Sequence, residues 1–72
     1  MGTPRYDRAS VVRRVEQRRG VLGLSRDGLA RRAGLTPVAV ERVLGCHRDM
    51  TLREAAGVAR ALGVTVAWLT QG

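Results

Sequence analysis

Apolar residues recur along the chain at the three- and four-residue spacing of amphipathic helices, and the segments with this pattern are separated by glycines or by residues that cap helices. The first segment predicts a helix that is capped by Asp7 or Ser10 and runs to about Arg19, with Val12 and Val15 on its inward face. No four-residue alternation of apolar and polar residues lacks a better helical interpretation. The pattern therefore predicts an all-α fold without strands.

The next two helices are predicted from the residues that start them. Ser25 is placed to cap a second helix that extends through Ala33. Thr36 and Pro37 predict the start of a third helix, because the threonine hydroxyl accepts from a free amide and proline lacks only an N–H that would have no partner there. This helix runs to about Leu44, so the two helices are joined by a short turn.

The last part of the chain predicts two more helices. Thr51 and Glu54 have the spacing of a capping box, in which the hydroxyl and the carboxylate each bind a backbone amide at the helix start. The fourth helix is expected to end at Gly63 and to present four apolar residues on its inward face. These are Leu52, Ala55, Ala59 and Leu62. A last short helix is expected over residues 66–70.

The length of the chain, 72 residues, corresponds to a single domain. Gly2 and Pro4 discourage regular structure, so we expect a flexible N-terminal arm over residues 1–6 and one domain over residues 7–72. No apolar run approaches the roughly 20 residues of a membrane span, and the N-terminus lacks the apolar stretch of a signal peptide. We therefore expect no membrane contact. Lysine, isoleucine, asparagine and phenylalanine, which have AT-rich codons, are all absent, so we also expect a GC-rich genome and a location in the cytoplasm of a bacterial host cell.

The net charge of the chain indicates which kind of partner it binds. Thirteen basic residues, all arginines, stand against six acidic residues, which gives a net charge of +7. Nine of these arginines lie in residues 1–32 with only three acids, so the positive charge is concentrated in the first half. Such a surface attracts polyanions.

The reactive side chains exclude several classes of protein. The one cysteine, Cys46, and the one histidine, His47, are too few for an intramolecular disulfide or a structural metal site. Ser25, His47 and Asp49 are the only conceivable hydrolytic set, and Ser25 is better explained as a helix cap than as a nucleophile. We therefore expect no enzyme, no cofactor and no metal.

The segment from Arg26 to Val43 resembles the helix-turn-helix of the Cro and phage-repressor (XRE-type) family. In such a motif a small residue, here Ala30, stands where the two helices touch, and a glycine, here Gly34, stands in the turn. Val40 and Val43 are the branched apolar residues that hold the second helix down. With the helices predicted downstream, the resemblance covers roughly residues 10 to 70.

The resemblance implies a compact five-helix, lambda-repressor-like DNA-binding domain whose third helix enters the major groove. Arg26 stands where the family often has a glutamine that contacts a backbone phosphate. Leu44 and Cys46 replace the glutamate and glycine that commonly close the third helix.

Two sets of DNA contacts are expected from this resemblance. Base contacts are assigned to Pro37, Val38, Ala39 and Arg42. Phosphate contacts are assigned to Arg26, Thr36, Arg19, His47 and Arg48. Arg42 alone can make a bidentate contact with guanine, worth ~1 to 3 kcal/mol of discrimination, whereas its apolar neighbours suit thymine methyl groups.

Each of these assignments has a structural alternative. Arg42 could instead pair with Asp49, Glu54 or Glu41 on a solvated face, and the arginines of the first helix could serve only solubility. Trp68 belongs either to the core or to a contact between two copies of the chain.

The sequence thus predicts a sequence-specific regulator of transcription that binds double-stranded DNA. A Cro-like or small immunity repressor of a temperate phage or mobile element is expected, acting by operator occupancy as a homodimer on half-sites about one helical turn apart. No small-molecule ligand is expected. The alternative is an antitoxin or adaptor whose helix-turn-helix face binds a protein through its apolar residues.

Overall fold

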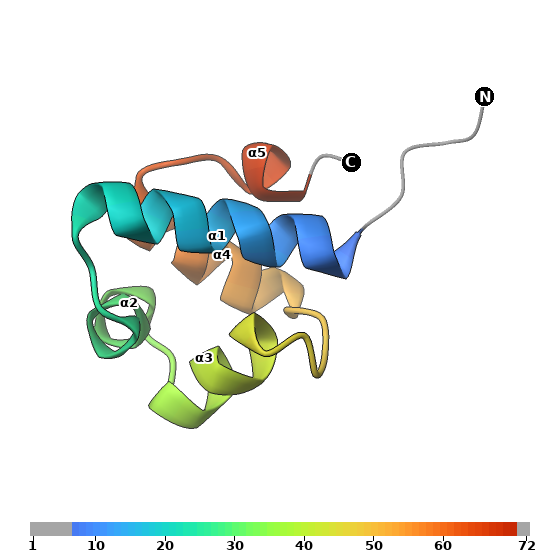
Figure 1. Ribbon diagram of the computed structural model, residues 1–72, viewed down its shortest axis with the longest axis horizontal. Helices are drawn as coiled ribbons and strands as arrows, with labels where there is room; N and C mark the ends of the chain where they lie inside the picture. Colours follow the sequence, from blue (N-terminus) through green and yellow to red (C-terminus); the bar gives the residue numbers. More distant parts are fainter. Residues whose placement is uncertain (1–6, 71–72) are drawn as a thin grey trace.

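The computed structural model describes residues 7–70, most of which form five helices. These are α1 Arg8–Leu22, α2 Arg26–Ala33, α3 Pro37–Leu44, α4 Leu52–Leu62 and α5 Val66–Thr70 (Figure 1). No strand occurs between residues 7 and 70, so the expected all-α, five-helix fold is confirmed. The expected arm over residues 1–6 lies outside the described residues.

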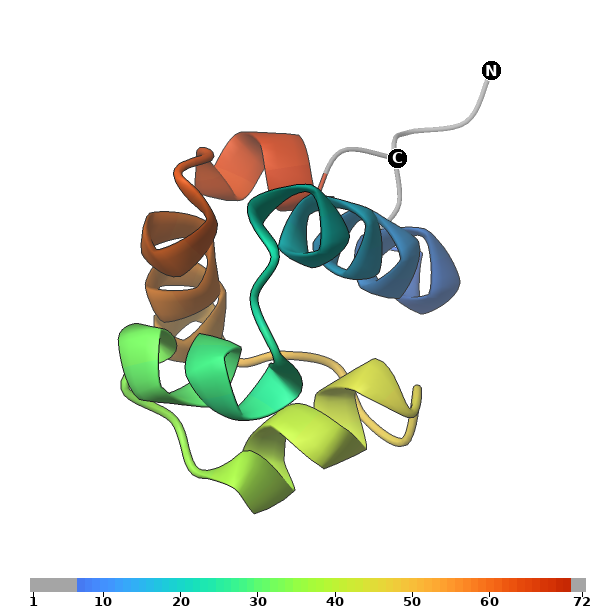
Figure 2. The ribbon, with the colours of Figure 1, turned by 60° about the vertical axis from the view of Figure 1, so that its left-hand side comes forward.

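The helices surround one apolar core. α2 packs against α3 and α4, while α1 and α4 both contact α5. In both views of the ribbon, α3 and α5 lie on opposite sides of the molecule (Figures 1 and 2). All five helices contribute to the core, which contains Val11, Val15, Leu29, Ala30, Ala33, Val40, Leu44, Val58, Ala59, Leu62 and Leu69.

Side-chain caps begin α2, α3 and α4 as predicted. The hydroxyl oxygens of Ser25 and Thr36 accept from the backbone N–H three residues later, at 2.9 and 3.1 Å. Thr51 and Glu54 form the full capping box, with the Thr51 hydroxyl accepting at 3.1 Å and the Glu54 carboxylate accepting at 2.9 Å. Local sequence therefore determines where these three helices start.

Helix α1 extends beyond the expected end near Arg19. It continues through Gly20 to Leu22, and Gly23 ends it with a left-handed φ of 67°. A single glycine inside a helix costs only about 1 kcal/mol relative to alanine, so Gly20 does not terminate it. Asp7 occupies the N-cap position, but its carboxylate accepts from the Ser10 hydroxyl at 2.7 Å and caps no backbone amide.

Two expected core positions differ from the structure. α1 buries Val11 and Val15, which are four residues apart and share a face, while Val12 is half-buried at the edge of the core. Leu52 is 79% exposed, so its expected place in the core is wrong. Leu52 is the first residue of α4, and Met50 in the preceding loop packs against the core instead.

The position of the helix-turn-helix depends on a close contact between α2 and α4. A Cβ atom at Gly57 would lie 2.4 Å from the backbone oxygen of Ala33, so only glycine allows the two helices this separation. Because α3 packs against α2, this contact also fixes α3 relative to the rest of the domain.

Candidate nucleic-acid interface

The turn between α2 and α3 holds the outer face of α3 toward solvent. Ala30 is 1% exposed, and Gly34 adopts a left-handed φ of 73° in the turn. Val40 and Val43 are 2% and 5% exposed and anchor α3 through its inner face. The four residues that carry the resemblance to a helix-turn-helix thus occupy the positions expected of them.

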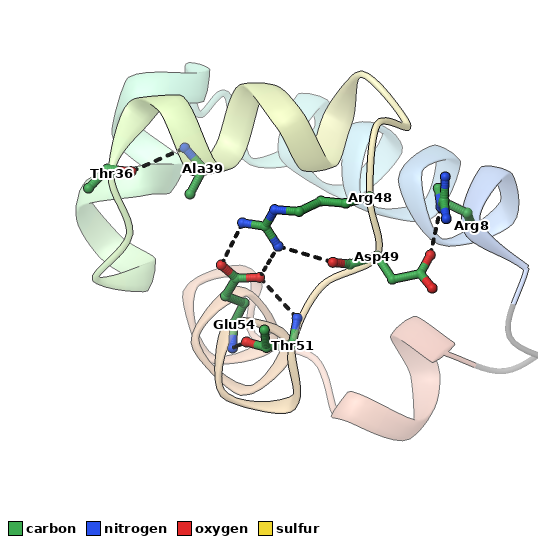
Figure 3. Close-up of polar contacts among 7 residues, drawn as sticks. All are labelled: Arg8, Thr36, Ala39, Arg48, Asp49, Thr51 and Glu54. Carbon is green, nitrogen blue, oxygen red and sulfur yellow. Dashed lines mark hydrogen bonds and ion pairs between the residues drawn. The ribbon is translucent and has the colours of Figure 1, made fainter.

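The outer face of α3 and the following loop line a shallow groove of about 800 Å³. Three of the four residues expected to contact bases line this groove: Pro37, Val38 and Arg42. The fourth, Ala39, is half-buried and donates its backbone N–H to Thr36 at 3.1 Å (Figure 3). His47 and Arg48, two of the five residues expected to contact phosphates, line the far end of the groove.

Arg42 is exposed and lines the groove on the outer face of α3. Its side chain forms no hydrogen bond or ion pair with any residue between 7 and 70. The acids that could have paired with it have other partners, because Asp49 binds Arg8, Glu54 binds Arg48, and Glu41 binds Arg26. The structural alternative for Arg42 is therefore not observed.

Arg48 is bound to α4 by two parallel hydrogen bonds. Its Nη1 and Nη2 atoms donate to the two carboxylate oxygens of Glu54 at 2.7 and 2.8 Å, and Nη1 also donates to the Asp49 carbonyl oxygen at 3.0 Å (Figure 3). The Arg48 guanidinium and the Thr51 amide lower the pKa of Glu54 from 4.5 to about 2. Arg48 thus holds the α3–α4 loop while 36% of its side chain stays exposed.

The same loop is held from the other side by α1. Arg8 Nε donates to Asp49 Oδ1 at 2.6 Å, and Arg8 Nη1 donates to the Cys46 carbonyl oxygen at 3.1 Å. Sequence reasoning missed this contact, because the two residues are 41 positions apart and no local pattern connects them. The loop that carries His47 is consequently fixed at both ends, with His47 itself exposed.

An ion-pair chain connects α1, α2 and α3. Arg19 binds Glu16 within α1 and donates to the Leu24 carbonyl oxygen at 2.7 Å. Arg26 Nη2 donates to Glu16 Oε2 at 3.0 Å, and Arg26 Nη1 donates to Glu41 Oε1 at 3.2 Å. Arg26 keeps 44% of its side chain exposed, whereas Arg19 keeps 23%. Arg19 therefore joins α1 to the α1–α2 linker, and Arg26 connects the start of α2 to α1 and α3.

Two other arginines of α1 donate hydrogen bonds to backbone carbonyl groups at the C-terminal ends of α4 and α5. Arg18 Nε donates to the Leu62 carbonyl oxygen at 3.0 Å, and Arg14 Nη1 donates to the Leu69 carbonyl oxygen at 3.4 Å. Leu62 ends α4, and Leu69 lies in the last turn of α5. Because a helix C-terminus carries partial negative charge and unpaired carbonyl groups, these arginines stabilise the fold.

No group of three or more His, Cys, Asp and Glu side chains between residues 7 and 70 could hold a metal ion. None of the five helices has the length and apolar character that a membrane span requires.

Comparison with solved structures places this arrangement in a family, although no family model matches the chain and no curated protein matches it significantly. The hypothetical transcription factor NHTF from Neisseria is 31% identical, has a TM-score of 0.81, and is matched over 86% of this chain and 70% of its own. The restriction-modification controller protein C.AhdI from Aeromonas hydrophila is 28% identical, also with a TM-score of 0.81, over 88% of this chain and 96% of its own.

The biofilm master regulator SinR, solved in complex with DNA, shares the fold. It has a TM-score of 0.76 at 23% identity over 82% of this chain and 95% of its own. The 31% identity to NHTF covers most of both chains and accompanies the helix-turn-helix geometry. The chain therefore belongs to the XRE-type helix-turn-helix family of DNA-binding transcription regulators, and it is not an enzyme.

Proposed function

We propose that the chain is a Cro-like or small immunity repressor of a temperate phage or mobile element, which represses transcription by occupying an operator in double-stranded DNA. One observation carries this proposal: Arg42 is unpaired among the described residues and lies in the groove on the outer face of α3. In a helix-turn-helix this face enters the major groove, where an arginine can bind the O6 and N7 atoms of guanine through two hydrogen bonds.

The residues beside Arg42 suit apolar parts of bases. Val38 is 60% exposed and precedes Arg42 by four positions, so the two side chains share a face of α3. Pro37 lines the same groove, and both residues can contact thymine methyl groups. Ala39 is half-buried, so its contact would be the smallest of the four proposed base contacts.

The proposed phosphate contacts differ in the donors that they retain. Arg26 uses two N–H groups on Glu16 and Glu41, which leaves three of its five for a phosphate. Arg48 uses three N–H groups on Glu54 and Asp49, which leaves Nε and one N–H of Nη2 for a phosphate. His47 is exposed beside Arg48, and Thr36 is exposed at the start of α3. Arg19 is the weakest of the proposed contacts, because Glu16 and the Leu24 carbonyl already engage its guanidinium.

We propose a homodimer on DNA, because one module of this size buries too little surface for tight specific binding. The exposed side of α5 supports this proposal. Trp68 is 36% exposed there, whereas its neighbour Leu69 is fully buried in the core. Since α5 lies on the side away from α3, a second copy bound there would leave the groove of α3 open (Figures 1 and 2). The DNA in the SinR structure and the controller protein among the relatives also agree with a regulator that binds DNA.

The test is selection of bound duplexes from a random double-stranded DNA pool at near-physiological salt. Enrichment of a two-fold repeated half-site, with centres about 10 base pairs apart, supports a dimeric operator-binding repressor. Arg42→Ala should then relax the preference at one base pair of each half-site. Recovery of no sequence from the pool would contradict the proposal.

A second candidate function is an antitoxin or adaptor that binds a protein through this face. The exposed apolar surface of Pro37 and Val38 favours it. Under this alternative, Arg26→Ala combined with Arg42→Ala would leave DNA affinity unchanged, whereas Val38→Glu would release a protein that co-purifies with the chain.

A further inference from the structure

A carboxylate stands on the outer face of α3, where the interface is otherwise neutral or basic. Glu41 is the one acidic residue among the described residues that line the groove, and its side chain is 61% exposed. A negative charge at this position repels the DNA phosphates, so it lowers the affinity for DNA of any sequence. The ion pair with Arg26 reduces this repulsion, and a hydrogen-bond donor on the DNA would offset it further.

Glu41 is oriented by an ion pair with Arg26. Its Oε1 atom accepts from Arg26 Nη1 at 3.2 Å, and Arg26 Nη2 in turn donates to Glu16 Oε2 at 3.0 Å. Glu16 is itself bound by Arg19, so a chain of ion pairs connects Glu41 through Arg26 of α2 to α1. The other carboxylate oxygen of Glu41, Oε2, accepts no hydrogen bond and forms no ion pair with any residue between 7 and 70.

The chemistry of the major groove selects one partner for this oxygen. A carboxylate only accepts hydrogen bonds. Guanine presents two acceptors, and thymine presents an acceptor and a methyl group, so neither can donate to it. Adenine presents its N6 amino group as a donor, but the adjacent N7 atom is an acceptor and repels the other oxygen of the same carboxylate. Cytosine presents its N4 amino group as a donor, and it matches a carboxylate best.

We propose that Glu41 is a specificity-determining residue, which accepts a hydrogen bond from the N4 amino group of a cytosine in the major groove while Arg26 holds its carboxylate in position. This inference rests on the proposed operator binding. It adds a cytosine contacted by Glu41 to the guanine contacted by Arg42 in each half-site. The ion pair with Arg26 therefore has two roles, because it orients Glu41 and reduces its repulsion of the neighbouring phosphates.

The experiment compares the sequences selected by the wild-type chain, by Glu41→Gln and by a control, Asp27→Asn. Glutamine has nearly the shape of glutamate but carries a donor and an acceptor, which match adenine. In Glu41→Gln, the cytosine preference at one position of each half-site should fall by a factor between about 5 and 150, and adenine should be enriched there. Asp27→Asn removes the same charge from the exposed start of α2, and it should leave every base preference unchanged.

The possible results separate this inference from the proposed function. If the wild type selects an operator and Glu41→Gln binds all sequences more tightly with unchanged preferences, Glu41 acts only by repulsion. The inference is then overturned while the operator-binding function stands. If the wild type selects no sequence, both proposals fail. A lost cytosine preference in Glu41→Gln alone, with Asp27→Asn like the wild type, supports the inference.

Discussion

At the scale of single residues, the α3–α4 loop turns at Cys46, the one non-glycine residue with a positive φ (61°) between residues 7 and 70. An L-residue in this left-handed conformation costs about 1 to 2 kcal/mol, and glycine avoids the cost. Cys46→Gly should therefore raise the free energy of unfolding by about 0.5 to 1 kcal/mol, after the greater freedom of glycine in the unfolded chain is allowed for. Urea denaturation at neutral pH measures this change.

The matched control is Cys46→Ala, which keeps the Cβ atom and removes the thiol. Because the strain remains, its free energy of unfolding should stay within about 0.5 kcal/mol of the wild type. Equal stabilisation by alanine and glycine would assign the effect to the thiol and contradict the strain argument.

Glu54 makes the stability of the fold depend on pH. Folding lowers its pKa from the ordinary value of 4.5 to about 2, because Arg48 and the Thr51 amide bind the charged form. A group whose pKa is lowered by folding stabilises the fold above its unfolded pKa, and this contribution is lost as pH falls toward the folded value. Stability should therefore decrease between about pH 5 and pH 2.

Glu54→Gln should cost about 1 to 2 kcal/mol at neutral pH, since it removes the charge-assisted pair with Arg48, while the glutamine oxygen can still accept from the Thr51 amide. It should also flatten the decrease of stability below about pH 5. Urea midpoints for wild type and variant across this range measure both effects. Parallel pH curves for the two proteins would show that Glu54 is not the group responsible.

The roles of individual arginines could be predicted from the sequence only in part. The family pattern placed Arg42 and Arg26 at the interface, because the spacing within a helix-turn-helix fixes which positions face outward. It did not show that Arg48 is bound to Glu54 or that Arg8 is bound to Asp49. Such pairs depend on how the helices pack, which no local pattern in the sequence encodes.

At the scale of helices, the packing of α2 on α4 depends on Gly57. Alanine there would place its Cβ 2.4 Å from the Ala33 backbone oxygen, so the helices would have to move apart. Overpacking of this kind costs about 1 to 3 kcal/mol, which exceeds the gain of about 1 kcal/mol in helix propensity. Gly57→Ala should therefore lower the free energy of unfolding by up to about 2 kcal/mol in urea denaturation.

Gly20 provides the matched control within the same fold. It also lies inside a helix, but a Cβ atom there has no heavy atom within 4 Å. Gly20→Ala should therefore stabilise the chain by up to about 1 kcal/mol. A stabilising Gly57→Ala would contradict the close packing of α2 on α4.

The helix starts could be predicted from the sequence more reliably than the helix faces. Ser25, Thr36 and Thr51 cap where they were expected, because a cap binds amides within three residues of itself. The exposure of Leu52 was not predicted, since burial of a first-turn side chain depends on what lies opposite it. The extension of α1 past Gly20 was missed because one glycine is only a weak stop signal.

At the scale of the whole molecule, the count of thirteen arginines overstates the number of cations available to DNA. Arg18 and Arg14 bind helix ends, Arg19 binds Glu16, and Arg8 binds Asp49. The salt dependence of DNA binding should therefore reflect only the few arginines that contact phosphates. A count based on all thirteen would predict a much steeper dependence.

For a dimer with Arg26 and Arg48 on phosphates in each protomer, log affinity should fall with log salt at a slope of about −4 or steeper, at about −0.9 for each neutralised phosphate. Arg26→Ala should make this slope shallower by about 2 and weaken binding to operator and non-operator DNA, and it should also lower the cytosine preference, because it removes the ion pair that positions Glu41. Arg60→Ala, which removes an exposed charge from the last turn of α4, should leave the slope unchanged. Titrations of a labelled operator at several salt concentrations measure the slopes, and equal slopes for Arg26→Ala and wild type would remove Arg26 from the interface.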